Sequence, residues 1–133
     1  MPELFSDDWA SNYKQIWNSS EGIAQELGQS NFNSVVAFGV DGEDAPRVVL
    51  NISDGQIITA GNFHGESLNW DLRASLDEWV SLVAKPPGLM KLGLAYTSRK
   101  LKFKKGDYSV MIKDPRLSTA FVKCFALMGK ALS

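Results

Sequence analysis

The sequence predicts an α+β fold (an α/β sandwich), in which a five-stranded, mostly antiparallel sheet has helices on one face. Three observations predict it. Helix-periodic segments stand near both ends of the chain, β-branched stretches ending in Asp-Gly fill its middle, and a strand of alternating lysines and apolar residues follows near the C-terminus. The 133 residues suffice for a core of their own, so 1–133 is expected to be a single domain.

Periodicity and capping residues predict two helices before the first strand. In LFSDDWASNYKQIWNS, bulky apolar residues recur near helical spacing, and Ser6 can cap a helix whose first turn holds Asp7 and Asp8. SEGIAQELG predicts a second, short helix that stops at Gly28. Together they form an expected N-terminal helical segment over residues 1–31.

Four strands with short connections are expected between about residues 34 and 74, which favours an antiparallel meander. NSVVAFGVDG and PRVVLNISDG are rich in β-branched residues, and the second leads through Asp54–Gly55 into QIITAG, as in a hairpin. Residues 68–74 alternate strictly. One face is expected to be buried and the other wet, with Asn69, Asp71 and Arg73 in water.

The next helix has the clearest boundaries in the chain. Ser75 and Glu78 have the spacing of a capping box, and Pro86–Gly88 ends the segment. LMKLGLAYTS predicts a shorter helix after it.

The C-terminal part is expected to form a strand and a long helix. RKLKFKK reads as the strand, and we expect it to run on through YSVMIK. Asp114 as cap and Pro115 at the first helical position start the last helix. Its apolar stripe consists of Leu117, Phe121, Cys124, Phe125, Met128 and Leu132.

Charge is distributed unevenly along the chain. Residues 1–84 hold 3 basic and 13 acidic residues, whereas residues 85–133 hold 11 basic and 2 acidic ones. Two explanations of the basic strand stay open: solvation and protection of a sheet edge, or contact with an anionic membrane. Nucleic acid is not an expected partner, because the isoelectric point is about 5.8 and no recognition motif accompanies the lysines.

The residues needed for common catalytic and metal sites are missing. The one histidine, His64, lies in a Gly-flanked turn without a nucleophile motif, so no hydrolytic triad is expected. Cys124 lies on the apolar stripe of the last helix, where a buried, unreactive thiol is typical. No metal site and no cofactor are predicted. A single cysteine and the lack of a signal peptide favour a cytoplasmic location.

The stretch KLKFKKGDYSVMIK resembles the C-terminal signature of the sterol carrier protein type 2 family. The matching elements are Lys100–Lys102, Gly106–Asp107 and Val110–Lys113, and VVLNISDG and LNWDLRASLDEWVSLV are similar to earlier parts of the family pattern. The resemblance covers about residues 32–130. The sequence differs from the family pattern in three ways. Arg99 stands where the family usually has glycine, one extra residue precedes Gly106, and the last helix is large.

The resemblance implies a sheet and helices that enclose an apolar tunnel, with no catalysis. The ligand would be a sterol, fatty acid, acyl-CoA or phospholipid, and the last helix is our candidate lid. Membrane contact with anionic lipid would involve Lys100, Lys102, Lys104 and Lys105. From alternation and helix stripes we expect the lining to include Phe38, Leu50, Ile52, Trp70, Leu72, Phe103, Phe121, Phe125 and Met128.

Two other functions stay open on the sequence. A small isomerase or dehydratase would use Asp71 or Asp107 as a base, although Asp71 is expected to be exposed. A protein-interaction or dimerisation module would use the apolar last helix as its docking face. The oligomeric state is not predicted.

Overall fold

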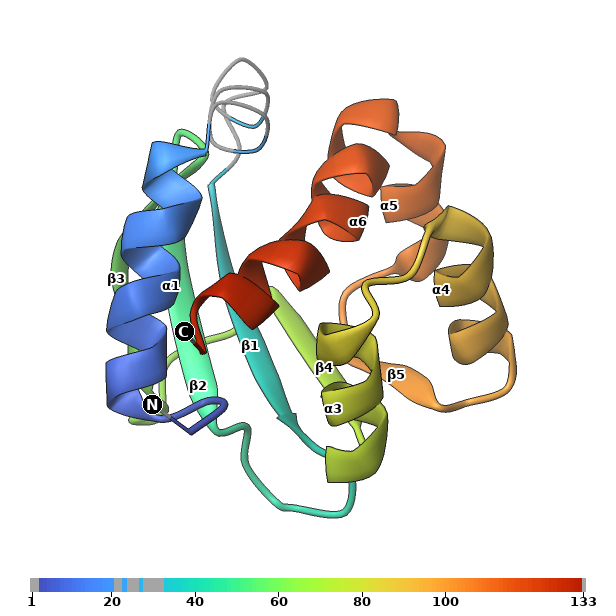
Figure 1. Cartoon of the computed structure of the whole chain (residues 1–133), viewed down its shortest axis with the longest axis horizontal. Coiled ribbons are helices and arrows are strands. Elements are labelled where there is room, and N and C mark those ends of the chain that lie inside the picture. The colour runs from blue at the N-terminus through green and yellow to red at the C-terminus, as the bar shows by residue number, and fades with distance from the viewer. Residues whose placement is uncertain (1–2, 21–22, 24–26, 28–32, 133) are drawn as a thin grey trace.

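The computed structural model describes residues 3–20, 23, 27 and 33–132. Within them the chain forms five helices and five strands, seen together in Figure 1. In chain order they are α1 (Asp7–Ser19), β1 (Ser34–Val40), β2 (Val48–Ser53), β3 (Gln56–Asn62), β4 (Trp70–Ala74), α3 (Leu76–Ala84), α4 (Leu89–Thr97), β5 (Leu101–Lys105), α5 (Tyr108–Lys113) and α6 (Pro115–Lys130). Most of the short helix predicted over residues 20–28 lies outside the described residues.

The five strands form one mixed sheet in the order β3-β2-β1-β4-β5. The predicted antiparallel meander is right for β1, β2 and β3. The hairpin turn between β2 and β3 has positive φ angles at Asp54 (49°) and Gly55 (80°), as a type I′ turn requires. It is wrong for β4, which pairs with β1 in parallel. Residues 63–69 are too long for a tight hairpin, and Asn69 N donates to Val35 O at 2.9 Å, so the new strand starts beside β1.

Helices cover one face of this sheet, which we call the helical face (Figure 1). Its centre carries Phe38, which lies opposite Leu72 on β4, and Leu50, which lies opposite Val36 on β1. Helix α1 lies over the β3 edge, α6 crosses the centre, and α3 to α5 lie over the β4–β5 side. The expected arrangement of helices on one face of a five-stranded sheet is confirmed.

Local capping explains where the helices begin. Ser6 Oγ accepts from Trp9 N at 3.2 Å, and Ser75 Oγ accepts from Glu78 N at 3.1 Å. Asp114 Oδ1 accepts from Arg116 N at 3.0 Å, and Pro115 follows it as the first helical residue. All three predicted caps are confirmed.

The strand predicted through YSVMIK is wrong, because these residues form α5. Gly106 has a φ of 95° and breaks the strand, and Asp107 Oδ1 accepts from Ser109 N at 2.8 Å as a helix cap. A Cβ on residue 106 would collide with the Trp70 indole. Close packing on Trp70 thus requires glycine here, and the chain turns away from the sheet at that point.

The predicted wet side of β4 is also wrong. Asp71 and Arg73 are only 4% and 3% exposed, on the sheet face opposite the helices. The β1–β2 connection, residues 41–47, packs against that face so closely that a Cβ on Gly39 would lie 2.8 Å from Pro46 Cα. Arg73 Nη1 donates to Glu43 O in this connection at 2.7 Å, so the connection both covers and satisfies the arginine.

Aromatic residues with bonded polar ends hold the helices on the sheet. Trp9 Nε1 donates to Met128 O at 3.2 Å and Tyr13 OH donates to Cys124 O at 3.1 Å, which tie α1 to α6. Trp79 Nε1 donates to Gly39 O at 2.8 Å and ties α3 to β1. Within the described part of the chain, no buried side-chain nitrogen or oxygen lacks a hydrogen-bond partner.

Candidate functional site

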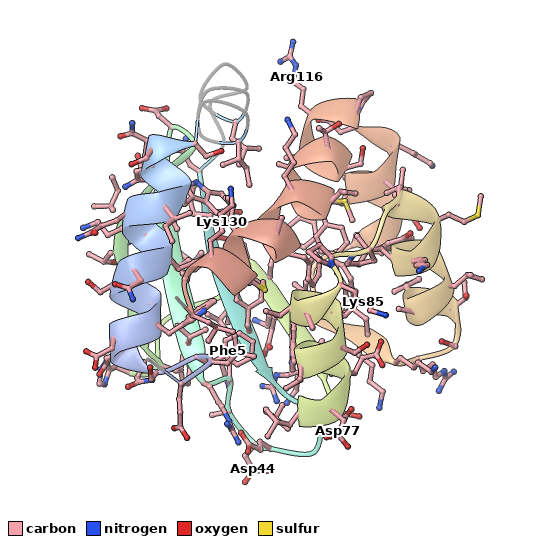
Figure 2. The ribbon with its side chains drawn as sticks, viewed as in Figure 1. Phe5, Asp44, Asp77, Lys85, Arg116 and Lys130 are labelled. Atoms are coloured by element: carbon pink, nitrogen blue, oxygen red, sulfur yellow. The ribbon has the colours of Figure 1, made fainter. Side chains whose placement is uncertain are left out.

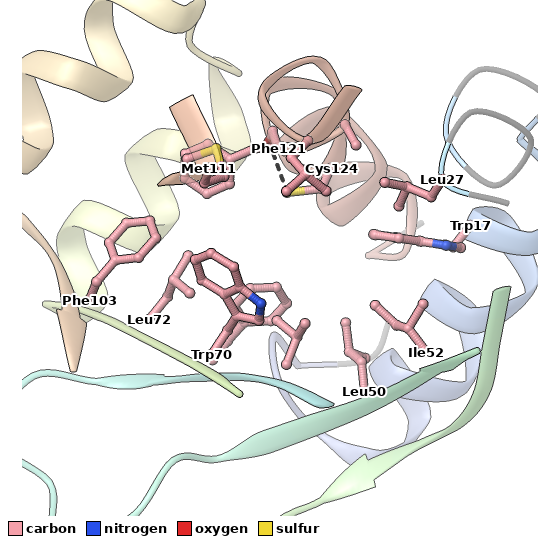
Figure 3. Close-up of a pocket in the computed structure, with 14 residues that line it drawn as sticks. Trp17, Leu27, Leu50, Ile52, Trp70, Leu72, Phe103, Met111, Phe121 and Cys124 are labelled. Carbon is pink, nitrogen blue, oxygen red and sulfur yellow. Dashed lines mark hydrogen bonds between the residues drawn. The ribbon is translucent and has the colours of Figure 1, made fainter. Parts of the chain in front are cut away.

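An apolar cavity lies between α6 and the helical face of the sheet (Figure 3). Its volume is about 80 Å³. Figure 3 shows Phe103 at one end and Trp17 with Leu27 at the other, while Leu50 and Ile52 rise from the sheet toward Cys124 on α6. The lining consists of Trp17, Leu27, Val36, Phe38, Leu50, Ile52, Trp70, Leu72, Phe103, Met111, Leu117, Ala120, Phe121 and Cys124.

Seven of the nine side chains expected from the sequence to line a tunnel meet at this cavity. They are Phe38, Leu50, Ile52, Trp70, Leu72, Phe103 and Phe121. Phe125 and Met128 do not line it, because both are fully buried further along α6, where Phe125 stacks on Trp79 at 6.2 Å between ring centroids.

The other lining residues lie outside the set that the sequence predicts. Val36 shares its strand face with Phe38, and Leu117 shares the α6 stripe with Phe121, so periodicity held a signal for both. The sequence predicts Met111 on a strand, whereas the structure places it on helix α5, which brings it to the cavity. Helical spacing in LFSDDWASNYKQIWNS puts Trp17 on the first helix, and its position at the cavity depends on how α1 packs.

The polar atoms of the lining side chains are all bonded within the protein. Trp17 Nε1 donates to Gly55 O at 2.8 Å, and Trp70 Nε1 donates to Ser34 Oγ at 3.2 Å. Cys124 Sγ donates to Phe121 O at 3.0 Å. Among the described residues the cavity therefore presents hydrocarbon and aromatic surface, which suits an apolar occupant.

Cys124 is the one titratable side chain among the lining residues that the structure describes, and it is not poised to react. Burial raises the pKa of its thiol to about 12. A thiol with that pKa stays protonated near neutral pH, and the nucleophile in cysteine chemistry is the thiolate. Burial likewise raises the pKa of Tyr13, which packs against the same residue. The prediction of a buried cysteine is confirmed.

An aromatic cluster fixes the Phe103 end of the cavity. The ring of Phe103 lies 5.6 Å from those of Tyr96 and Tyr108, 5.8 Å from that of Phe121 and 6.1 Å from that of Trp70. Tyr96 and Tyr108 stack on each other at 4.0 Å. Since Phe103 and Phe121 are only half-buried, this wall lies close to solvent.

The alternation of the β5 strand is as expected, with buried Leu101 and half-buried Phe103 on the helical face. Lys102 Nζ lies 2.9 Å from Asp41 Oδ2, and this hydrogen bond is the main reason that the pKa of Asp41 is lowered. Lys100, which directly precedes β5, and Lys104 and Lys105 within it are exposed, and none of the four lysines lines the cavity.

The carboxylates considered as catalytic bases are not at the cavity. Asp71 lies on the opposite sheet face and pairs with Arg73, and Asp107 caps α5. The apolar face of α6, considered for docking, is buried against the sheet and α1. The geometry therefore favours neither alternative function.

Among the described residues, no three His, Cys, Asp or Glu side chains lie close enough together to hold a metal ion. None of the helices in the described part of the chain has the length and apolar character needed to cross a membrane.

Solved structures of sterol carrier proteins have the same fold. A crystal structure of sterol carrier protein 2 is 22% identical with a TM-score of 0.74, over 96% of this chain and 98% of that one. The solution structure of a conserved hypothetical protein from Thermus thermophilus, described as possibly a sterol carrier protein, is 23% identical with a TM-score of 0.71, over 97% and 90%. A UbiJ-SCP2 ubiquinone synthesis protein is 17% identical with a TM-score of 0.60, over 99% and 96%.

No protein-family model and no curated protein sequence matches the chain. The structural likeness confirms that the chain has the sterol carrier protein 2 fold, over nearly its whole length.

Proposed function

We propose that this protein binds the apolar part of one lipid molecule, non-covalently and without catalysis, in the cavity between α6 and the sheet. The observation that carries the proposal is the lining itself, whose described side chains present only apolar surface and bonded polar atoms. The fold supports it, since sterol carrier proteins are built in the same way.

Hydrophobic transfer supplies the binding energy. Moving a methylene from water into such a site is worth about 0.8 kcal/mol, so even part of an acyl chain gives useful affinity. An apolar cavity of about 150 Å³ holds a benzene molecule. Because the volume here is about 80 Å³, a long chain requires the lining to move apart. A flexible acyl chain meets this requirement more easily than a rigid sterol, and α6 is the wall that would move.

The polar end of the ligand would stay outside the cavity. No charged side chain is among the lining residues that the structure describes, and burying an unpaired charge is strongly unfavourable. Val36, Trp70, Leu117 and Phe121 are partly exposed, so the cavity has contact with solvent where a head group could remain. A fatty acid, acyl-CoA or phospholipid therefore fits with its head group in water.

Native mass spectrometry of the purified full chain tests the proposal. The protein is measured as purified, and then after incubation with a fatty acid, an acyl-CoA, a phospholipid and a sterol. One bound lipid per chain, displaced by a second lipid of the same class, is the expected result. A protein that stays without ligand across this panel would contradict it.

A filling variant shows whether the ligand occupies this cavity. Ala120 lines it, so Ala120→Leu puts a larger side chain where the ligand would lie, and we expect loss of the lipid adduct. Ala126→Leu is the matched control, because Ala126 is exposed on the same helix. Retention of lipid by folded Ala120→Leu protein would place the ligand elsewhere.

Carriage of the lipid between membranes is a further part of the proposal, tested by transfer of a fluorescent fatty acid from donor to acceptor vesicles. The exposed lysines Lys100, Lys104 and Lys105, in and directly before β5, would support contact with anionic lipid there, whereas Lys102 forms an ion pair with Asp41. The single free cysteine suits a reducing compartment such as the cytoplasm.

A further inference from the structure

Helix α4 presents apolar side chains to solvent on its outer face. Met90 is 83% exposed, Leu94 64% and Leu89 43%, whereas Leu92 and Ala95 are buried against the protein. A helix on the surface of a soluble domain normally has a polar outer face. The outer face of α4 is therefore apolar where a surface helix is normally polar. Large exposed apolar groups of this kind mark interaction surfaces.

Beside this face, a groove between α3 and α4 gathers three lysines. Lys85 enters it from the end of α3, as Figure 2 shows, Lys91 from α4, and Lys100 from the segment that follows α4. The groove has a volume of about 520 Å³ and also contains Glu78 and the side chains of Leu94 and three hydroxyl residues, Ser81, Thr97 and Ser98. Within the part of the chain that the structure describes, none of these three lysines forms an ion pair.

A fourth cation stands at the end of α4 in a strained conformation. Arg99 has a φ of 63°, and the bonds from Arg99 N to Tyr96 O and from Lys100 N to Ala95 O close the helix in the manner that glycine favours. The arginine side chain is exposed. Strain of this kind persists most often where it has a function, and here it adds positive charge beside Lys100.

We propose that this surface docks on an anionic phospholipid bilayer. We call it the α4 surface and define it as Leu89, Met90 and Leu94 together with Lys85, Lys91, Arg99 and Lys100. Apolar side chains flanked by cations suit the boundary between acyl chains and anionic head groups. The charge of the rest of the molecule complements this, since α1, with Asp7 and Asp8, lies on the side away from α4 (Figure 1). An anionic membrane would repel that side and attract the α4 surface.

This inference rests on the proposed carriage of lipid between membranes and names the surface that would make the membrane contact. The α4 surface shares no residue with the cavity, so a failure of docking and a failure of lipid binding are distinguished by separate variants. Sedimentation of the full-length chain with vesicles tests it. One set is phosphatidylcholine alone, and the other contains equal amounts of phosphatidylcholine and phosphatidylglycerol. We expect binding to the anionic vesicles only, and a fall of tenfold or more at 1 M salt, where the Debye length is about 3 Å.

Neutralising single lysines measures their contribution. Lys85→Gln and Lys91→Gln should each weaken the partitioning about fivefold. Lys14→Gln on α1 is the matched control, with the same chemistry on the opposite side. Leu94→Gln should weaken partitioning about tenfold, and Ile58→Gln on β3, which starts from a similarly exposed side chain, should not.

Arg99→Gly separates docking from a structural role of the arginine. Glycine relieves the strain, so the melting temperature should rise while vesicle binding falls about fivefold. A rise in melting temperature with unchanged vesicle binding would show that Arg99 is outside the contact.

Several results would overturn the inference. Equal binding to the two vesicle sets would show that binding does not depend on anionic lipid. Equal effects of Lys14→Gln and Lys91→Gln would show that the contact is not at the α4 surface. Binding of inorganic phosphate with no binding to vesicles would indicate a site for small anions. A dimer in size-exclusion chromatography that Leu94→Gln dissociates would indicate a second copy of the chain as the partner.

Discussion

Arg73 and Asp71, two residues apart on β4, form a buried ion pair on the sheet face opposite the helices. Arg73 Nε lies 2.6 Å from Asp71 Oδ1, and Nη2 donates to Asp71 Oδ2 at 3.0 Å. This two-point contact holds the guanidinium close to Gly39, where the β1–β2 connection covers it. The pair therefore attaches a polar connection to the back of the sheet whose other face forms the cavity.

Removing one partner of this pair should destabilise the protein strongly. Arg73→Leu leaves the Asp71 carboxylate buried without its partner, and we expect a loss of about 3–5 kcal/mol in the free energy of unfolding. Urea denaturation measures it. The double variant Asp71→Leu/Arg73→Leu should recover part of this loss, since it removes both buried charges. A single variant as stable as the unchanged protein would mean that the carboxylate reaches water.

Gly106 should be essential for the packing of Trp70. Gly106→Ala adds a Cβ that collides with the indole and occupies a φ of 95°, so we expect a loss of about 3 kcal/mol in stability. Gly42→Ala is the matched control, because residue 42 has a similar φ of 91° with no atom near its Cβ. It should cost only about 1 kcal/mol, the contribution of backbone strain. Equal losses would show that the collision is relieved by movement of Trp70.

The cavity and the core should respond differently to the loss of neighbouring aromatic residues on α6. Phe121 lines the cavity, so Phe121→Ala should alter lipid affinity more than stability. Phe125 is fully buried outside it, so Phe125→Ala should lower the free energy of unfolding by about 3–5 kcal/mol and leave lipid stoichiometry unchanged. Urea denaturation and native mass spectrometry of both variants measure the two effects. The reverse pattern would mean that Phe125, which the apolar stripe of the last helix predicts to line the site, is the ligand-contacting residue.

Stability should fall as the pH rises from about 9 toward 12. The pKa of Cys124 is raised in the folded protein from an ordinary value of 9.0 to about 12, so the folded state keeps a proton that the unfolded state loses. The stabilisation is complete below pH 9 and is lost progressively as the pH approaches 12. Urea denaturation across this range measures the slope.

Cys124→Ala is the control for this pH dependence. It should remove the slope between about pH 9 and 10, while the raised pKa of Tyr13 still lowers stability above pH 10. An unchanged slope in this variant would exclude Cys124 as its cause. In the unchanged protein, the thiol should react with a disulfide reagent only on unfolding.

The elements that could be predicted from the sequence are those with a local cause. Ser6, Ser75 and Asp114 each bond a backbone amide two or three residues ahead, so the short pattern around each residue is sufficient to start a helix. The same holds for the hairpin at Asp54–Gly55, where two residues adopt the turn themselves. Alternation identified most of the cavity wall on the sheet, because successive strand residues point to opposite faces.

The errors arose where distant contacts outweigh local pattern. The YSVMIK segment alternates well enough for a strand, but Gly106 turns the chain at Trp70, 36 residues earlier, and Asp107 then caps a helix. The alternation of β4 correctly separated its two faces, yet it could not show that residues 41–47 cover the polar one.

The sequence by itself determined the number and kind of most elements, the helical face of the sheet and the apolar character of the space above it, because these follow from periodicity and capping within a few residues. Only the tertiary structure decided that β4 runs parallel to β1, that Asp71 and Arg73 are buried, and that Trp17 and Met111 reach the cavity while Phe125 does not. Each of those outcomes depends on which surfaces, far apart in the chain, exclude water together. A pattern of residues records that a side chain is apolar, whereas packing decides whether it faces the core or a cavity.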